Sequence, residues 1–211
     1  MTTRLRLYND AALLVGERSL SSLTESVELR RLLDQVWDSN GVRKCLEEGQ
    51  WRFAMRTQKI DYDPDIEPDF GLNRAFTKPS DWVLTSSVCS DEYFTEPLLN
   101  YTDEAGYWYS DVDSIYVKFV SDDAAYGMDM NSWPDSFQEF VSAHFASRIV
   151  LKAASSDKAK NIFALREKLL KVAKSKAAMA EPTKFTPRGS WTRARQYGSR
   201  GDRGNRGSLT G

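Results

Sequence analysis

Two neighbouring stretches of the sequence have different hydrophobic periods: residues 113–122, DSIYVKFVSD, and residues 132–149, SWPDSFQEFVSAHFASRI. In the first, Ile115, Val117 and Phe119 alternate with Tyr116 and Lys118, and this alternation predicts a β-strand. In the second, apolar residues recur every three or four positions, which predicts a helix. Its expected buried stripe consists of Phe137, Phe140, Val141, Phe145 and Ile149. The chain must therefore change from strand to helix near residue 131.

The opposite change is expected near residue 51. Apolar residues at helical spacing predict one helix over residues 7–17 and a longer one over residues 24–48. We expect Asn9 or Asp10 to cap the first helix and Gly16 to end it, with Thr24 and Gly49 bounding the second. Residues 51–59, WRFAMRTQK, then alternate apolar and polar side chains as a strand does.

These changes predict an α+β fold in which one structural unit is inserted into another. N-terminal helices in residues 1–50 and C-terminal helices in residues 132–181 are expected to form a helical bundle. Residues 51–131 are expected to form an antiparallel β insertion, with a hairpin turn at residues 103–106, DEAG. Residues 182–211 form an extended basic arm in this interpretation.

Charge is divided unevenly along the 211 residues, although the formal net charge is only −1. Residues 151–211 contain fifteen Lys/Arg and four Asp/Glu, whereas residues 1–150 contain fourteen and twenty-six. Such asymmetry indicates two surfaces with different neighbours, or head-to-tail contacts between copies of the chain. The opening MTTRLRLYND lacks a signal-peptide core, and no stretch approaches 18 consecutive apolar residues, so we expect no membrane contact.

The sequence offers little that is typical of an enzyme, a metal site or a cofactor site, and we expect none of the three. His144 is the single histidine, so a catalytic triad would depend on it alone. The acidic run at residues 61–69 places carboxylates at odd positions, as a calcium loop does, but lacks the required Gly and terminal Glu. We expect a solvated loop, or one that faces a basic neighbour.

Three further features leave alternatives open. A carboxylate pair of the glycosidase type is possible in any acidic protein. The aromatic stretch at residues 107–116, YWYSDVDSIY, could stack sugars or bases, but a packed or interface-forming β unit is the favoured interpretation. Cys45 and Cys89 have no metal-binding or redox spacing and are expected to be buried, reduced thiols.

The C-terminal residues 183–211 are rich in Arg and Gly and have too few apolar residues to form a core. One interpretation is an Arg/Gly segment that binds nucleic acid. The other is an arm that becomes ordered when it inserts into a partner protein, with Trp191 and Tyr197 as anchors and arginines as bidentate donors.

The order of several segments resembles the head-to-tail adaptors of short-tailed bacteriophages, the tail tubular protein A family. The matching segments span about 190 residues: NDAALLVGERSLSSL, EEGQWRFAMRTQKI, PSDWV, DEAGYWYSDVDSIYVKFVS, WPDSFQEFVSAHFASRIVLKAAS and PRGSWTRAR. The resemblance implies the same fold as above, a helical bundle with a β insertion and a C-terminal arm. The family has no catalytic motif to transfer.

The resemblance also implies a function: a structural virion protein at the head–tail interface, assembled in the host cytoplasm. Twelve copies are expected to form a ring between the portal protein and the tail nozzle protein, around a channel through which DNA passes without sequence-specific binding. Tail fibres are a further candidate partner. The resemblance assigns portal binding to the arm, at Phe185, Arg188, Trp191, Arg193, Arg195 and Tyr197. The alternatives are a nucleic-acid-binding protein that uses the Arg/Gly tail and a polysaccharide hydrolase.

Overall fold

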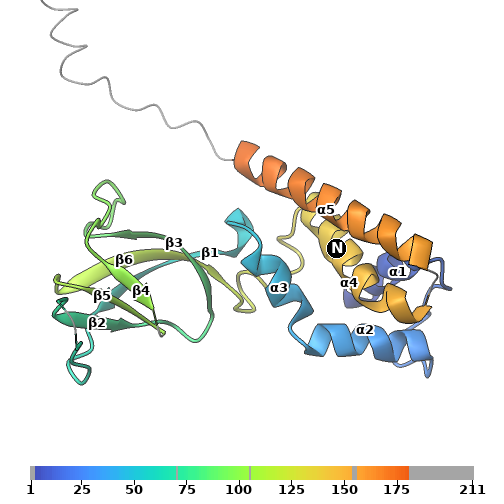
Figure 1. Ribbon diagram of the computed structural model, residues 1–211, viewed down its shortest axis with the longest axis horizontal. Helices are drawn as coiled ribbons and strands as arrows, with labels where there is room; N and C mark the ends of the chain where they lie inside the picture. The colour runs from blue at the N-terminus through green and yellow to red at the C-terminus, as the bar shows by residue number, and fades with distance from the viewer. Residues whose placement is uncertain (1–2, 70, 105, 154–155, 181–211) are drawn as a thin grey trace, which may run out of the picture. The chain divides into compact units, whose positions relative to one another are not determined.

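The computed structural model describes residues 3–69, 71–104, 106–153 and 156–180. Within these ranges the fold is mixed α+β, as predicted, with five α-helices and two three-stranded antiparallel sheets. Figure 1 shows the helices gathered on one side of the described chain and the strands on the other. Every strand lies between residues 55 and 121, after three of the helices and before the other two.

The first helix, α1 (Arg4–Val15), begins earlier than predicted. Thr3 is its N-cap, and the Thr3 hydroxyl accepts a hydrogen bond from the backbone N–H of Arg6 at 3.2 Å. The predicted cap Asn9 lies inside the helix instead, and its side-chain amide bonds both backbone groups of Leu20. Gly16 ends the helix with φ of 83°, as its conformational freedom predicted.

The predicted long helix over residues 24–48 is two helices, α2 (Glu28–Asp38) and α3 (Gly41–Glu47). The break lies at Asn40, whose φ of 61° is left-handed and incompatible with a continuous helix. Gly41 then approaches the end of α2 so closely that a Cβ there would lie 2.6 Å from the carbonyl oxygen of Val36. The sequence Ser39-Asn40-Gly41 combines weak helix formers, and this explains why the helix breaks here.

The helical core forms around α4 (Asp135–Ala153), against which α1, α2, α3 and α5 (Ser156–Met179) pack. The predicted stripe of α4 is buried throughout: Phe137, Phe140, Val141, Phe145 and Ile149. Trp51 and Phe53 join this core, with ring centroids 4.8 and 4.7 Å from that of Phe137. The predicted strand over residues 51–59 was therefore wrong at its start, because residues 52–54 form a 3₁₀ turn that directs both rings toward the helices.

The β insertion contains two sheets. The first has the strand order β1 (Met55–Asp61), β6 (Ser114–Ser121) and β3 (Trp82–Cys89). The second has the order β2 (Arg74–Thr77), β5 (Tyr107–Ser110) and β4 (Thr102–Glu104), and β4 and β5 form the predicted hairpin. The inward face of β6 packs with Phe76 and Trp108 in a second hydrophobic core, separate from the helical one.

Polar contacts join the first sheet to the helices. Arg43 of α3 pairs with Asp122 after β6 and donates to the backbone oxygen of Trp82 at 2.7 Å. Arg56 of β1 pairs with Asp81 at 2.8 Å, and the Ser121 hydroxyl donates to the same carboxylate. The contacts of Arg43 hold the start of β3 and the end of β6 next to α3, and the contacts of Asp81 join β1 to β6 at the same end of the sheet.

Candidate functional site

The single histidine is enclosed by cations rather than by catalytic partners. His144 lies on α4 and is 7% exposed, and its Nδ1 accepts a hydrogen bond from Nε of Arg166 at 3.2 Å. Its Nε2 is buried and has no hydrogen-bond partner among the described residues. Burial lowers the pKa of His144 from 6.5 to about 4, and the charges of Arg166, Arg148 and Lys44 act in the same direction.

The side chain of Arg166, on α5, contacts residues of α3, α4 and α5. Its guanidinium pairs with Glu48, which ends α3, and with Glu167 beside it on α5. It also lies over the ring of Phe140, 5.6 Å from the centroid. A triad would need a carboxylate on one imidazole nitrogen and a nucleophile near the other, and the described residues place neither on His144. The geometry is that of a packing contact between α4 and α5.

The acidic run forms an exposed loop between β1 and β2. Asp63 is used internally, because its carboxylate accepts the backbone N–H of Asp65 and the hydroxyl of Thr77, both at 3.1 Å. The side chains of Asp65, Glu67 and Asp69 have no hydrogen bond or ion pair with other described residues. Across the described ranges, no three His, Cys, Asp or Glu side chains are grouped to hold a metal ion, so nothing favours the calcium interpretation.

The aromatic stretch belongs to a packed β unit. Trp108 is fully buried, and its indole N–H lies 3.1 Å from both the hydroxyl of Thr85 and the carboxylate of Asp103. Lys78 pairs with Asp103 and lies over the ring of Trp82 at 3.9 Å. Because the ring of Trp108 is fully buried, it offers no open face on which a sugar or base could stack.

Both cysteines are buried free thiols, as predicted. Burial raises the pKa of Cys45, and nearby Glu48 adds to the effect. Burial likewise raises the pKa of Cys89, with Asp91 acting in the same direction. The thiolate forms are therefore disfavoured at neutral pH, so the environment of neither cysteine is typical of a nucleophile.

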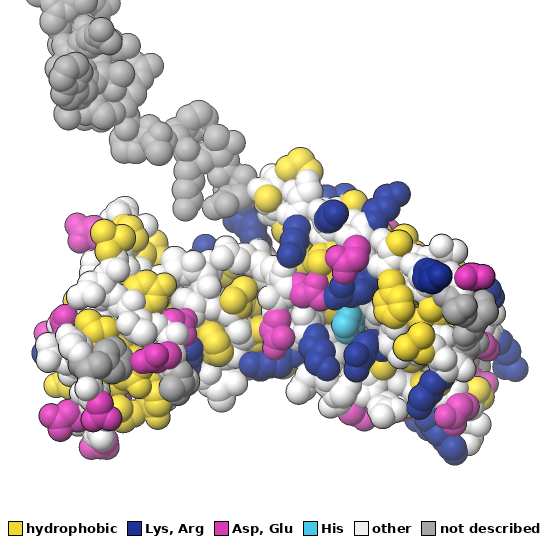
Figure 2. Space-filling view, in the orientation of Figure 1, with side chains coloured by type: hydrophobic (Ala, Val, Ile, Leu, Met, Phe, Trp, Pro, Cys, Tyr) yellow, Lys and Arg dark blue, Asp and Glu magenta, His cyan; other side chains and the backbone are white. Residues whose placement is uncertain are grey.

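Charge separates between the two parts of the fold. Residues 51–131 contain sixteen Asp/Glu and six Lys/Arg, whereas the helical residues 3–50 and 132–180 together contain twelve Asp/Glu and sixteen Lys/Arg. On the face shown in Figure 2, Lys and Arg side chains gather over the helices, while Asp and Glu are frequent over the strands. The helix α5 alone exposes lysines at positions 158, 160, 168, 171, 174 and 176.

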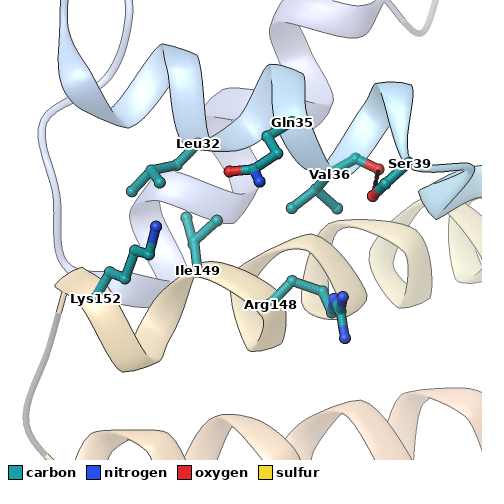
Figure 3. Close-up of a pocket in the computed structure, with 7 residues that line it drawn as sticks. All are labelled: Leu32, Gln35, Val36, Ser39, Arg148, Ile149 and Lys152. Carbon is teal, nitrogen blue, oxygen red and sulfur yellow. Dashed lines mark hydrogen bonds between the residues drawn. The ribbon is translucent and has the colours of Figure 1, made fainter.

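A cleft of about 270 Å³ lies between α2 and α4. Its apolar lining is Leu32, Val36 and Ile149, and its polar lining is Gln35, Ser39, Arg148 and Lys152. Figure 3 shows Ile149 and Lys152 directed from α4 toward α2, while the side chain of Arg148 runs along α4. The Ser39 hydroxyl donates to the backbone oxygen of Val36 at 3.1 Å. With two cations and no acidic side chain in its lining, the cleft suits an anionic group.

Sequence reasoning did not find this cleft. Gln35 and Arg148 are separated by more than one hundred positions, and neither residue belongs to a motif. The one available signal was the pair Arg148 and Lys152, spaced i and i+4 at the end of the predicted helix. The sequence did not indicate which helix faces that pair.

The predicted portal-binding residues lie outside the described residues: Phe185, Arg188, Trp191, Arg193, Arg195 and Tyr197. Their assignment stays a prediction. In the ranges that the model describes, no helix is both long and apolar enough to cross a bilayer. Comparison with known proteins found no matching family model and no matching curated protein.

Proposed function

We propose that this chain is a structural virion protein, the head-to-tail adaptor of a short-tailed bacteriophage. In this proposal twelve copies form a ring between the portal and the tail nozzle, and the ring surrounds the DNA exit channel. The observation that carries the proposal is the order of the segments that resemble the adaptor family. The segments that lie within the described ranges fall in α1, at the end of α3, in β1, at the start of β3, in the β4–β6 region and in α4.

The character of the surface supports a protein that works by contact. Large apolar side chains are exposed on both parts of the fold, among them Leu13 and Leu151 on the helices and Tyr93 and Leu99 in the β3–β4 loop. Single exposed apolar side chains are common on soluble proteins, so the division of charge carries more of the argument than they do. The acidic β insertion and the basic C-terminal helices also suit contacts between copies.

The residues considered as candidates for an enzyme make other contacts in the described ranges. His144 contacts Arg166, the acidic loop gathers no metal-binding group, and both thiols are buried. The arm remains the reason to keep a second candidate, a nucleic-acid-binding protein. The exposed lysines of α5 favour that candidate, because a basic helix next to an Arg/Gly segment can neutralise phosphates.

One attachment experiment separates the two candidates. Full-length protein and a version ending at Glu181 are mixed with purified portal rings, with and without DNA, and examined by co-sedimentation and negative-stain microscopy. The adaptor proposal expects rings on the portal with the full chain and none with the truncated chain. Tight, salt-sensitive binding of DNA by the full chain, with no attachment to portal, would instead identify a nucleic-acid-binding protein.

A further inference from the structure

We propose that the cleft between α2 and α4 binds the acidic loop, residues 61–69, of a second copy of the chain. This inference rests on the proposed function, because it names two surfaces through which neighbouring adaptors contact each other. The two surfaces differ, so the contact is heterologous and can continue from copy to copy until a ring closes.

The cleft has two cations available for such a contact. Arg148 and Lys152 are exposed and make no hydrogen bond or ion pair with other described residues. The partly buried arginines elsewhere in the described ranges are paired, namely Arg4, Arg30, Arg43, Arg56, Arg74 and Arg166. The two unpaired cations flank apolar side chains, so a bound carboxylate is partly shielded from water and its attraction to them is strengthened.

The loop presents matching carboxylates on a restrained backbone. Asp65, Glu67 and Asp69 are exposed and unpaired within the described ranges. Pro64 and Pro68 fix their own φ angles and favour extended conformations in the residues before them. Asp63 anchors the loop at its start, since its backbone N–H donates to the Ala75 oxygen at 2.8 Å and its carboxylate holds Asp65. A restrained loop loses little conformational freedom on binding.

The occupant we name is a second copy because the charges of the chain are complementary across its two parts. The loop belongs to the β insertion, with sixteen Asp/Glu and six Lys/Arg, and the cleft belongs to the helices, whose residues 3–50 and 132–180 contain twelve Asp/Glu and sixteen Lys/Arg. Within one copy, the lining consists only of residues from α2, its C-cap and α4. Figure 1 shows the loop between β1 and β2 on the strand side, away from α2.

The test is self-association of the full chain, measured by sedimentation velocity over a range of concentrations and salt. We expect concentration-dependent association that weakens as salt rises. Arg148→Ala/Lys152→Ala and Asp65→Ala/Glu67→Ala should each raise the dissociation constant by about tenfold or more. A mixture of the two variants retains one intact cleft and one intact loop, so it should stop at one-to-one complexes.

Two sets of variants separate this contact from a general charge effect. Lys171→Ala/Lys174→Ala and Glu92→Ala/Glu104→Ala change the net charge equally at other exposed sites and should associate as the wild type does. A single chain with Arg148→Glu, Lys152→Glu, Asp65→Lys and Glu67→Lys should regain association. The inference is overturned by a wild type that stays monomeric at every concentration, by a cleft variant that associates normally, or by controls that weaken association as much.

The experiments distinguish a failure of the cleft inference from a failure of the adaptor proposal. Portal attachment by the full chain together with unaltered association of the cleft variant would overturn the cleft inference and leave the adaptor proposal standing. Association through the cleft without portal attachment would support the cleft inference and overturn the adaptor proposal. It would identify a self-assembling protein with another role.

Discussion

At the scale of residues, the buried imidazole of His144 is the most unusual group of the described chain. It accepts a hydrogen bond from a cation at one nitrogen and has no described partner at the other. An imidazole in such a place stays neutral because burial lowers its pKa, and the positive charge of Arg166 beside it acts in the same direction. Folding therefore selects the neutral form and makes stability depend on pH.

We expect stability to fall as the pH drops from 6.5 toward 4. In that window the unfolded chain protonates His144 and the folded chain does not, which removes up to about 3 kcal/mol of unfolding free energy at the lower limit. His144→Gln should flatten this dependence in urea titrations at several pH values. Carboxylates with lowered pKa values, such as Glu25 and Asp81, act in both proteins and cancel in the comparison. Parallel pH profiles of the two proteins would contradict the assignment.

Gly41 provides a second test at this scale. Alanine is a better helix former by about 0.5–1 kcal/mol, but its Cβ would lie 2.6 Å from the backbone oxygen of Val36, which cannot move aside. We expect the clash to dominate, so that Gly41→Ala lowers the unfolding free energy by about 1–3 kcal/mol. Gly71→Ala, where a Cβ meets nothing within 4 Å, is the control and should change it by less than about 0.5 kcal/mol. Equal effects would show that the close approach at Gly41 is unimportant.

At the scale of elements, hydrophobic periodicity correctly predicted the strands and helices that have one continuous apolar face. The strand β6 and the stripe of α4 are buried as predicted, because each presents one continuous apolar face. The break at Asn40 and the 3₁₀ turn after Trp51 were not predicted. The turn depends on the contact of Trp51 with Phe137 of α4, which is distant in the sequence. The break lies in the weak helix formers Ser39-Asn40-Gly41, a local signal that the apolar period does not report.

The stripe of α4 can be tested by paired truncations. Phe137 is 1% exposed and contacts the rings of Trp51, Phe53 and Trp133, so Phe137→Ala should lower the unfolding free energy by about 3–5 kcal/mol. Phe163 on α5 is 43% exposed, and Phe163→Ala should cost well under half as much. Urea denaturation followed by circular dichroism measures both. Similar midpoints for the two variants would contradict the position of the core.

At the scale of the whole molecule, the sequence predicted the plan but not the surfaces. The alternation of periods placed the β insertion between helices, and the charge count indicated two unlike surfaces. The cleft required knowledge that α2 packs on α4, which no local pattern contains. The arm was the most distinctive part of the sequence, and it lies outside the described residues.

The proposed role of the arm gives a prediction at this scale. Trp191→Ala should weaken attachment to portal rings in co-sedimentation, because a buried aromatic anchor of an interface contributes about 2 kcal/mol or more. The melting temperature of the free protein should stay unchanged, since the proposal places Trp191 in the contact with the portal and not in the core of its own chain. Tyr93→Ala, which removes an exposed ring from the β3–β4 loop, is the control for attachment. A large fall in melting temperature for Trp191→Ala would show that this residue packs on its own chain.

The pairing of β1 with β6 has a consequence for how such a protein can diversify. Met55, at the entry to the β insertion, is the direct partner of Val120 near its exit. The chain therefore leaves and rejoins the helices at nearly one point, as in folds that tolerate the exchange of a whole inserted module. Recombination at these two positions could replace the strands as a cassette while the helices keep their connection. The two parts of the molecule are then free to diverge at different rates, each under selection from its own neighbours.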